Sequence, residues 1–177
     1  MKMIHLISAL TMLSAQEMCL AASDNSAQKT PNEVFTPETV LPSGVDSTTS
    51  TNPYTGESGP ARKGTVAATL NNIALLNSLL SEQASPENQV KTDKVIEAIT
   101  SLIPSLRFIG VFDLFTTEEW LSAKDQPGRV LVAVLYLQKY PQNITPAIKQ
   151  LLMQIRGQTR IKTISESIDM ALKESRS

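Results

Sequence analysis

Histidine and cysteine are almost absent from this sequence. The chain of 177 residues contains one of each, His5 and Cys19, and both lie in an N-terminal apolar stretch. If that stretch is removed, neither an imidazole nor a thiol remains. Catalysis by Ser-His-Asp or Cys-His nucleophiles, thiol redox chemistry and zinc sites with nitrogen or sulfur ligands are then excluded. We therefore assign no catalytic residue, and we expect no cofactor and no bound metal.

Glycine-rich loops and disulfides are lacking as well. The glycines of residues 61–177, Gly64, Gly110, Gly128 and Gly157, are isolated from one another, so no phosphate-binding loop of the P-loop or dinucleotide type can be drawn. A single cysteine cannot form an intramolecular disulfide. The fold must therefore depend on hydrophobic burial, which calls for a domain of about a hundred residues or more.

The N-terminus has the pattern of an export signal. Lys2 precedes an apolar run from Met3 to Ala15, and the small residues Ala21, Ala22 and Ser23 follow. About 13 residues give roughly 20 Å of helix, too short for the ~30 Å core of a bilayer. We predict a signal peptide over residues 1–22, a periplasmic or secreted protein, and no transmembrane helix after cleavage. The alternative is a buried N-terminal helix, which Gln16 and Glu17 favour.

Residues 23–60 have the composition of a linker. The segment is mostly Ser, Thr, Pro, Asn and Gly, and it contains too few large apolar side chains to offset the entropy of ordering it. It is also acidic, with Lys29 as its one basic residue. We predict a disordered linker. The alternative is that the region of Phe35 or Tyr54 docks on a partner or on the domain itself.

Residues 61–177 are predicted to form an all-α domain, a small bundle of about six helices. In the first helix, apolar residues recur at helical spacing from Val66 to Leu80, with Asn77 inside this stripe. The second begins at Ser85-Pro86, an N-cap followed by proline, and is expected to stop at Pro104. These two helices are expected to form an antiparallel hairpin.

The rest of the domain shows further helix signals. The apolar cluster from Leu106 to Phe115 is the predicted centre of the core. Thr116 and Glu119 form a capping-box pattern before a short helix in which Trp120 is expected to anchor the core. The apolar run from Val130 to Leu137 fits a strand or a helix, and the helical neighbours favour a helix. Two more helices are predicted after Thr145-Pro146 and from Ile161 onward.

Acidic residues near Trp120 suggest an enzyme hypothesis. Paired carboxylates beside an aromatic ring are the requirement of glycoside hydrolysis. The acids concerned are Asp113, Glu118, Glu119 and Asp125. The structural interpretation is stronger, because acids in the first turn of a helix stabilise its N-terminus.

The charge distribution is the most informative functional signal. No acidic residue occurs from Gln126 to Ser165, although six basic residues do. A one-sided stretch of this kind can contact an acidic protein surface, anionic lipid or nucleic acid. Little aromatic interleaving and the export signal disfavour nucleic acid. The candidate binding residues are Arg129, Lys149, Arg156, Arg160 and Lys162. The alternative is that these charges are spread over solvated helix faces.

Together these features favour a non-enzymatic binding or assembly module, exported into a bacterial cell envelope as part of a multi-protein machine. Its expected partner is a protein or an anionic envelope component, and the sequence does not indicate an oligomeric state. Two alternatives stay open: a carboxylate-dependent enzyme acting on cell-wall glycans, and a secreted effector.

Overall fold

The regularly spaced apolar residues form a helical protein, which a computed structural model describes over residues 33–41, 47–82 and 85–175. The helices are α1 (Pro37–Val40), α2 (Thr65–Ser81), α3 (Pro86–Ile109), α4 (Val111–Leu114), α5 (Thr117–Leu121), α6 (Pro127–Lys139), α7 (Pro146–Gln158) and α8 (Lys162–Glu174), with a short 3-10 turn η1 (Pro141–Asn143). Strands β1 (Ser47–Thr51) and β2 (Ser58–Arg62) form one antiparallel hairpin. The predicted all-α class is confirmed. The predicted signal peptide lies outside the described residues.

Helix α6 is the centre of the core. All eight residues from Val130 to Leu137 are buried, and the helix packs against α8, α2 and α5. A helix that is apolar on every side is stable only when neighbours surround it. The run is therefore a helix, as predicted. The expected core centre at 106–115 was wrong, because Leu114 and Phe115 are 60% and 48% exposed while Phe112 is buried.

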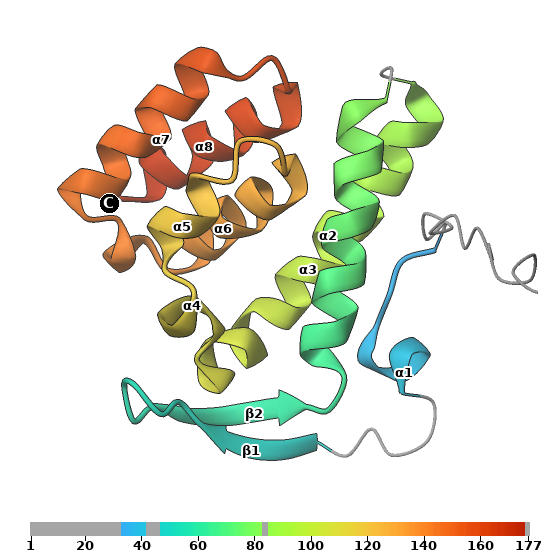
Figure 1. Cartoon of the computed structure of the whole chain (residues 1–177), viewed down its shortest axis with the longest axis vertical. Coiled ribbons are helices and arrows are strands. Elements are labelled where there is room, and N and C mark those ends of the chain that lie inside the picture. Colours follow the sequence, from blue (N-terminus) through green and yellow to red (C-terminus); the bar gives the residue numbers. More distant parts are fainter. Residues whose placement is uncertain (1–32, 42–46, 83–84, 176–177) are drawn as a thin grey trace, which may run out of the picture.

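Helices α2 and α3 pack side by side as the predicted hairpin, as Figure 1 shows. The predicted apolar stripe of α2 is correct at Ile73 and Leu76 but wrong at Val66 and Leu70, which are exposed. The buried face contains the polar residue Asn72 in their place. The side chain of Asn77 accepts a hydrogen bond from the Gly128 amide at 2.8 Å, so the partner that this position required lies on α6.

The prediction that Pro104 ends the second helix was wrong, because α3 continues through it to Ile109. Proline inside a helix loses one backbone hydrogen bond and costs about 3 kcal/mol. Ile103 and Leu106 on either side of it are both fully buried, and burying each such side chain contributes about 1.5–3 kcal/mol. Continuing the helix therefore offsets the cost of the proline. The helix ends instead at Gly110, which adopts a left-handed conformation with φ of 85°.

Part of the predicted disordered linker is folded. Residues 33–41 contain α1 and lie along α2, while residues 47–60 contribute β1 and most of the hairpin, which lies across the end of α3 (Figure 1). Apolar content alone gave the wrong expectation here because buried amide side chains, Asn52 and Asn72, hold these segments by hydrogen bonds. The stated alternative, in which the regions of Phe35 and Tyr54 dock on the domain itself, describes this stretch.

Candidate functional site

Large apolar side chains gather on one exposed face of the protein. Among the described residues, nine large hydrophobic side chains are exposed, and six of them line two adjoining hollows of about 470 Å³ each. We call this surface the apolar groove and define it by these six residues. They are Leu41, Tyr54, Val66, Leu70, Leu114 and Phe115. Exposed patches of this kind mark binding surfaces in soluble proteins.

Three elements form the walls of the apolar groove. Helix α2 contributes Val66 and Leu70, which line both hollows together with Ile109 at the end of α3. The α3–α4 junction and α4 provide the opposite wall of the first hollow, and the hairpin tip at Tyr54 closes one end of it. None of the described residues that line this first hollow is charged. The second hollow contains Arg62 and Lys63, so the groove is basic at that end.

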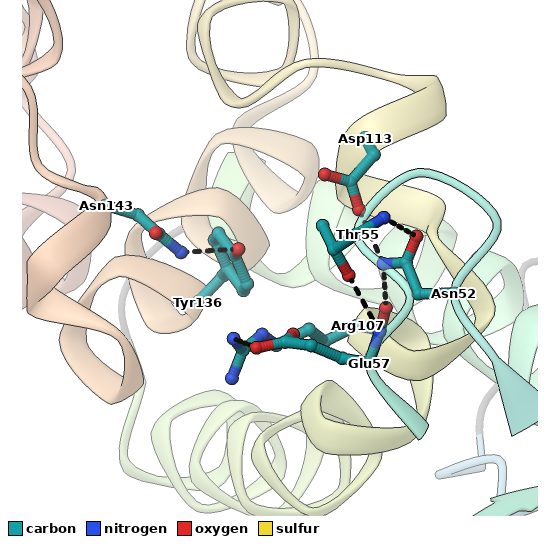
Figure 2. Close-up of polar contacts among 7 residues, drawn as sticks. All are labelled: Asn52, Thr55, Glu57, Arg107, Asp113, Tyr136 and Asn143. Atoms are coloured by element: carbon teal, nitrogen blue, oxygen red, sulfur yellow. Dashed lines mark hydrogen bonds and ion pairs between the residues drawn. The ribbon is translucent and has the colours of Figure 1, made fainter. Parts of the chain in front are cut away.

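The hairpin tip is fixed in place by Asn52, which is 1% exposed. Its Oδ1 accepts hydrogen bonds from the amides of Tyr54 and Thr55, at 2.8 and 3.2 Å. Its Nδ2 donates to the Arg107 carbonyl at 2.7 Å and to an Asp113 carboxylate oxygen at 2.8 Å (Figure 2). Both polar atoms of the buried amide therefore have partners. The result is that the tip is attached to the α3–α4 junction.

Gly110 allows this close approach. Its positive φ suits glycine, and a Cβ atom there would lie 3.1 Å from the Tyr54 ring and 3.2 Å from Asn52 Oδ1. The Arg107 side chain adds an ion pair with Glu57 at 2.5 Å and lies over the Tyr140 ring, with its guanidinium carbon 4.4 Å from the ring centre. One wall of the apolar groove is thus held at a fixed position by contacts behind it.

Buried aromatic side chains pack beneath the surface of the apolar groove. Trp120 is 5% exposed and lines the first hollow. The Phe112 ring lies between Trp120 and Tyr136, with ring centres 5.4 and 3.9 Å away. The Tyr136 hydroxyl accepts a hydrogen bond from Asn143 at 2.6 Å (Figure 2), and burial raises the pKa of Tyr136. The predicted role of Trp120 as a core anchor is confirmed.

Two of the four acids of the enzyme hypothesis, Asp113 and Glu119, have structural partners. The Asp113 carboxylate accepts the hydrogen bond from Asn52, and the Glu119 carboxylate accepts one from the Thr116 amide at 2.6 Å. The predicted capping box at the start of α5 is therefore confirmed. Trp120 is covered by Phe112 and by Arg129, whose guanidinium carbon is 5.3 Å from the ring centre, so its ring is not open for sugar stacking. In the described part of the chain, no cluster of three acidic, histidine or cysteine side chains is arranged for a metal ion.

The five predicted binding residues lie on three elements and in one loop. Arg129, at the start of α6, packs on Trp120, while Lys149 is exposed on α7 and Arg160 is exposed between α7 and α8. Arg156 forms two hydrogen bonds with Asp169 of α8, and Lys162 lies 3.4 Å from Glu166. Glu166 and Asp169 lie just after the acid-free stretch 126–165. The charge pattern of that stretch therefore did not show that they neutralise two of its basic residues. A basic binding surface stays a prediction.

Sequence reasoning missed the apolar groove, although a signal was present. Val66 and Leu70 were assigned to the core because helical spacing cannot show which face of a helix has a neighbour. The cluster at 106–115 was assigned to the core for the same reason. An excess of apolar residues on α2 and α4 beyond what the core can contain was the available signal.

Comparison with known protein families gives a match over only part of the chain. Residues 56–140 match a family model described as a domain of unknown function (DUF7709). That range runs from the hairpin through α6 and includes Val66, Leu70, Leu114 and Phe115 of the apolar groove. No curated protein and no solved structure matches the chain. Within the described ranges, no helix is both long and apolar enough to cross a membrane.

Proposed function

We propose that this chain is a non-enzymatic binding module of a bacterial cell envelope and that it binds a protein partner in the apolar groove. The observation that carries the proposal is that six of the nine large apolar side chains exposed in the described part of the chain lie in one surface. Leaving these side chains in water has a free-energy cost that a partner would remove. A smaller cavity of about 240 Å³ between α5, α6 and α7 contains none of them.

The proposed occupant is an amphipathic helix of another protein. The walls are helices α2 and α3–α4, which offer apolar side chains and no charge in the first hollow, and this suits the apolar face of a helix. Lys63 is exposed at the other end, whereas Arg62 there forms an ion pair with Glu38. An acidic residue at one end of the partner helix would complement Lys63 and set its direction.

Site-specific photocrosslinking tests this proposal in cells that express the protein. A photoreactive amino acid at position 70 or 115 should crosslink to the partner, and the same group at position 153 should not. Met153 is the matched control because it is 58% exposed, close to the 59% of Leu70, but lies on α7 outside the groove. The crosslinked protein is identified by mass spectrometry and purified, so that its affinity can be measured.

Calorimetry with the purified partner then gives the decisive comparison. Leu70→Glu should weaken binding by about tenfold or more, because it places a carboxylate in an apolar contact. Met153→Glu should stay within about twofold of the unaltered protein. Equal affinities for both variants, or a partner crosslinked only from position 153, would contradict the groove as the docking surface.

Location in the envelope is a separate part of the proposal and rests on residues 1–22. The mass of the mature protein from a fractionated cell gives both the cleavage site and the compartment. A mature N-terminus near Ser23 in the periplasmic or extracellular fraction is the expected result. An intact N-terminus in the cytoplasmic fraction would remove export from the proposal and leave the docking surface to be judged by the crosslinking.

A further inference from the structure

A buried side chain of α2, Asn72, binds residues 33–41 through two hydrogen bonds. The Phe35 amide donates to Asn72 Oδ1 at 2.8 Å, and Asn72 Nδ2 donates to the Phe35 carbonyl at 2.8 Å. Asn72 is fully buried. Its amide therefore pairs with one residue of an extended segment as a neighbouring β-strand does, through main-chain groups that every residue except proline has.

Side-chain contacts add selectivity on both sides of Phe35. Val34 packs against the core, and Pro37 is buried against Gly64, where an added Cβ would lie 3.1 Å from the Pro37 carbonyl oxygen. Glu38 forms an ion pair with Arg62. Along the segment, the features that make contact are an apolar side chain at Val34, the main-chain groups of Phe35, and a helical turn that begins at Pro37 and includes the acid Glu38.

The contacts of this segment resemble those of a bound peptide. They run to Asn72 of α2, to Gly64 just before that helix and to Arg62 at the end of β2, and all of them are non-covalent. A covalent connection raises the local concentration of a segment at its site and adds no contact of its own. A copy of the segment on another chain can make the same contacts.

We propose that the face of α2 centred on Asn72 is a peptide-binding site and that its ligand, the segment Glu33–Leu41, can be supplied by a second copy of this chain. In a single chain the segment occupies its own site. When that contact is weakened, the site accepts the segment of a neighbour. The segment contributes Leu41 to the second hollow of the apolar groove, but its contacts with Asn72, Gly64 and Arg62 are argued without any partner in that groove, so the inference does not depend on the proposed function.

Two full-length variants with complementary defects test the proposal. Phe35→Pro removes the amide that donates to Asn72, which leaves the site intact but without its own segment. Asn72→Ala impairs the site but leaves the segment intact and released. Native mass spectrometry of a mixture, with one variant labelled with heavy nitrogen, should show a heterodimer in which the second variant donates its segment to the first.

Two controls separate this result from general association. The heterodimer should be about tenfold more abundant than in a mixture of Phe35→Pro with the double variant Phe35→Pro/Asn72→Ala, which has neither an intact segment nor an intact site. Phe35→Ala keeps the main-chain amide that donates to Asn72, so its own segment should stay bound. This variant should therefore not bind the segment of a second copy. Equal amounts of dimer in both mixtures, or no dimer in either, would overturn the proposal.

A second measurement keeps the test valid if Asn72→Ala does not fold. The synthetic peptide Glu33–Leu41 with a fluorescent label should bind full-length Phe35→Pro in an anisotropy titration. The unaltered chain should bind it about tenfold more weakly, because its own segment competes for the site. Absence of binding to Phe35→Pro up to millimolar peptide would also overturn the proposal.

Discussion

Helix α6 and the hairpin β1–β2 are attached to the protein by different forces. Helix α6 contributes eight consecutive buried residues, and its attachment is apolar burial in every direction. The hairpin contributes few apolar side chains, and its tip is held by the four hydrogen bonds of Asn52 and by the ion pair of Glu57 with Arg107. Burial of apolar surface therefore holds α6, whereas a few hydrogen bonds and one ion pair hold the hairpin tip.

This difference has consequences for function. Apolar burial is distributed over many atoms, so no single side chain decides whether α6 is in place. Directional contacts concentrate the attachment in one residue, and the elements held in that way can be released separately from the core. Both elements of this second kind, the hairpin tip and the segment 33–41, contribute to the apolar groove.

The largest effect is expected in the core. Leu131→Ala removes a fully buried side chain of α6 and should lower the free energy of unfolding by about 2–5 kcal/mol. Urea unfolding followed by circular dichroism measures this loss. Hydrogen exchange should increase in all helices together, because α6 contacts most of the others. A loss confined to α6 would show that the core does not unfold as one unit.

A smaller and local effect is expected at the hairpin. Asn52→Ala leaves the Tyr54 and Thr55 amides without their acceptor and should cost about 1–3 kcal/mol. The amides of β2 should exchange faster while those of α6 stay protected. Thr55→Ala is the matched control at the same turn, because the Thr55 hydroxyl accepts only one exposed hydrogen bond, from the Glu57 amide at 3.3 Å. Equal changes in both variants would contradict the role of Asn52.

The same division explains what the sequence could and could not predict. Helix caps at Ser85, Thr116 and Thr145, and the apolar run of α6, were predictable because each follows from a local pattern. The attachment of Asn52 and Asn72 was not, since each bonds to a residue 37 or more positions away, and a lone asparagine has no pattern that names its partner.

The candidate site was missed for a related reason. Leu70 and Leu76 both fit the apolar period of α2, yet one is 59% exposed and the other fully buried. Only the packing of α3 and α6 on one side of the helix separates them. Sequence periodicity therefore predicted the helix and its apolar residues, but the distinction between core and binding surface depends on contacts between distant segments.

Acid should weaken the segment 33–41 before it weakens the core. The pKa of Glu38 lies below its ordinary range, first because its carboxylate accepts a backbone hydrogen bond in its own turn, and then because of the Thr36 hydroxyl and Arg62. A lowered pKa in the folded state contributes stability above the unfolded pKa of about 4.3, and this contribution is lost as the pH falls through the folded value. Exchange of the Leu41 amide, corrected for its intrinsic rate, should therefore rise below about pH 4.

Glu38→Gln is the control for that experiment. It cannot titrate, so the protection of the Leu41 amide should lose this acid-dependent component, while the amide still bonds to the Pro37 carbonyl at 2.9 Å. If the unaltered chain and Glu38→Gln respond alike to acid, the response comes from another group. Asp169 is the first to test, since its hydrogen bond with Arg156 also lowers its pKa.

The smallest effect on stability is expected in the basic stretch. Arg156 and Asp169 are both about half exposed, and an ion pair in water contributes little and is screened by salt. Arg156→Gln should therefore shift the midpoint of thermal unfolding much less than Asn52→Ala does, and the difference from the unaltered protein should shrink as salt is added. A large shift that persists in high salt would show that this pair behaves like the buried contacts of Asn52. If the shift is small, Arg156 can be changed without disturbing the fold, and a loss of partner affinity in that variant reports directly on the predicted basic surface.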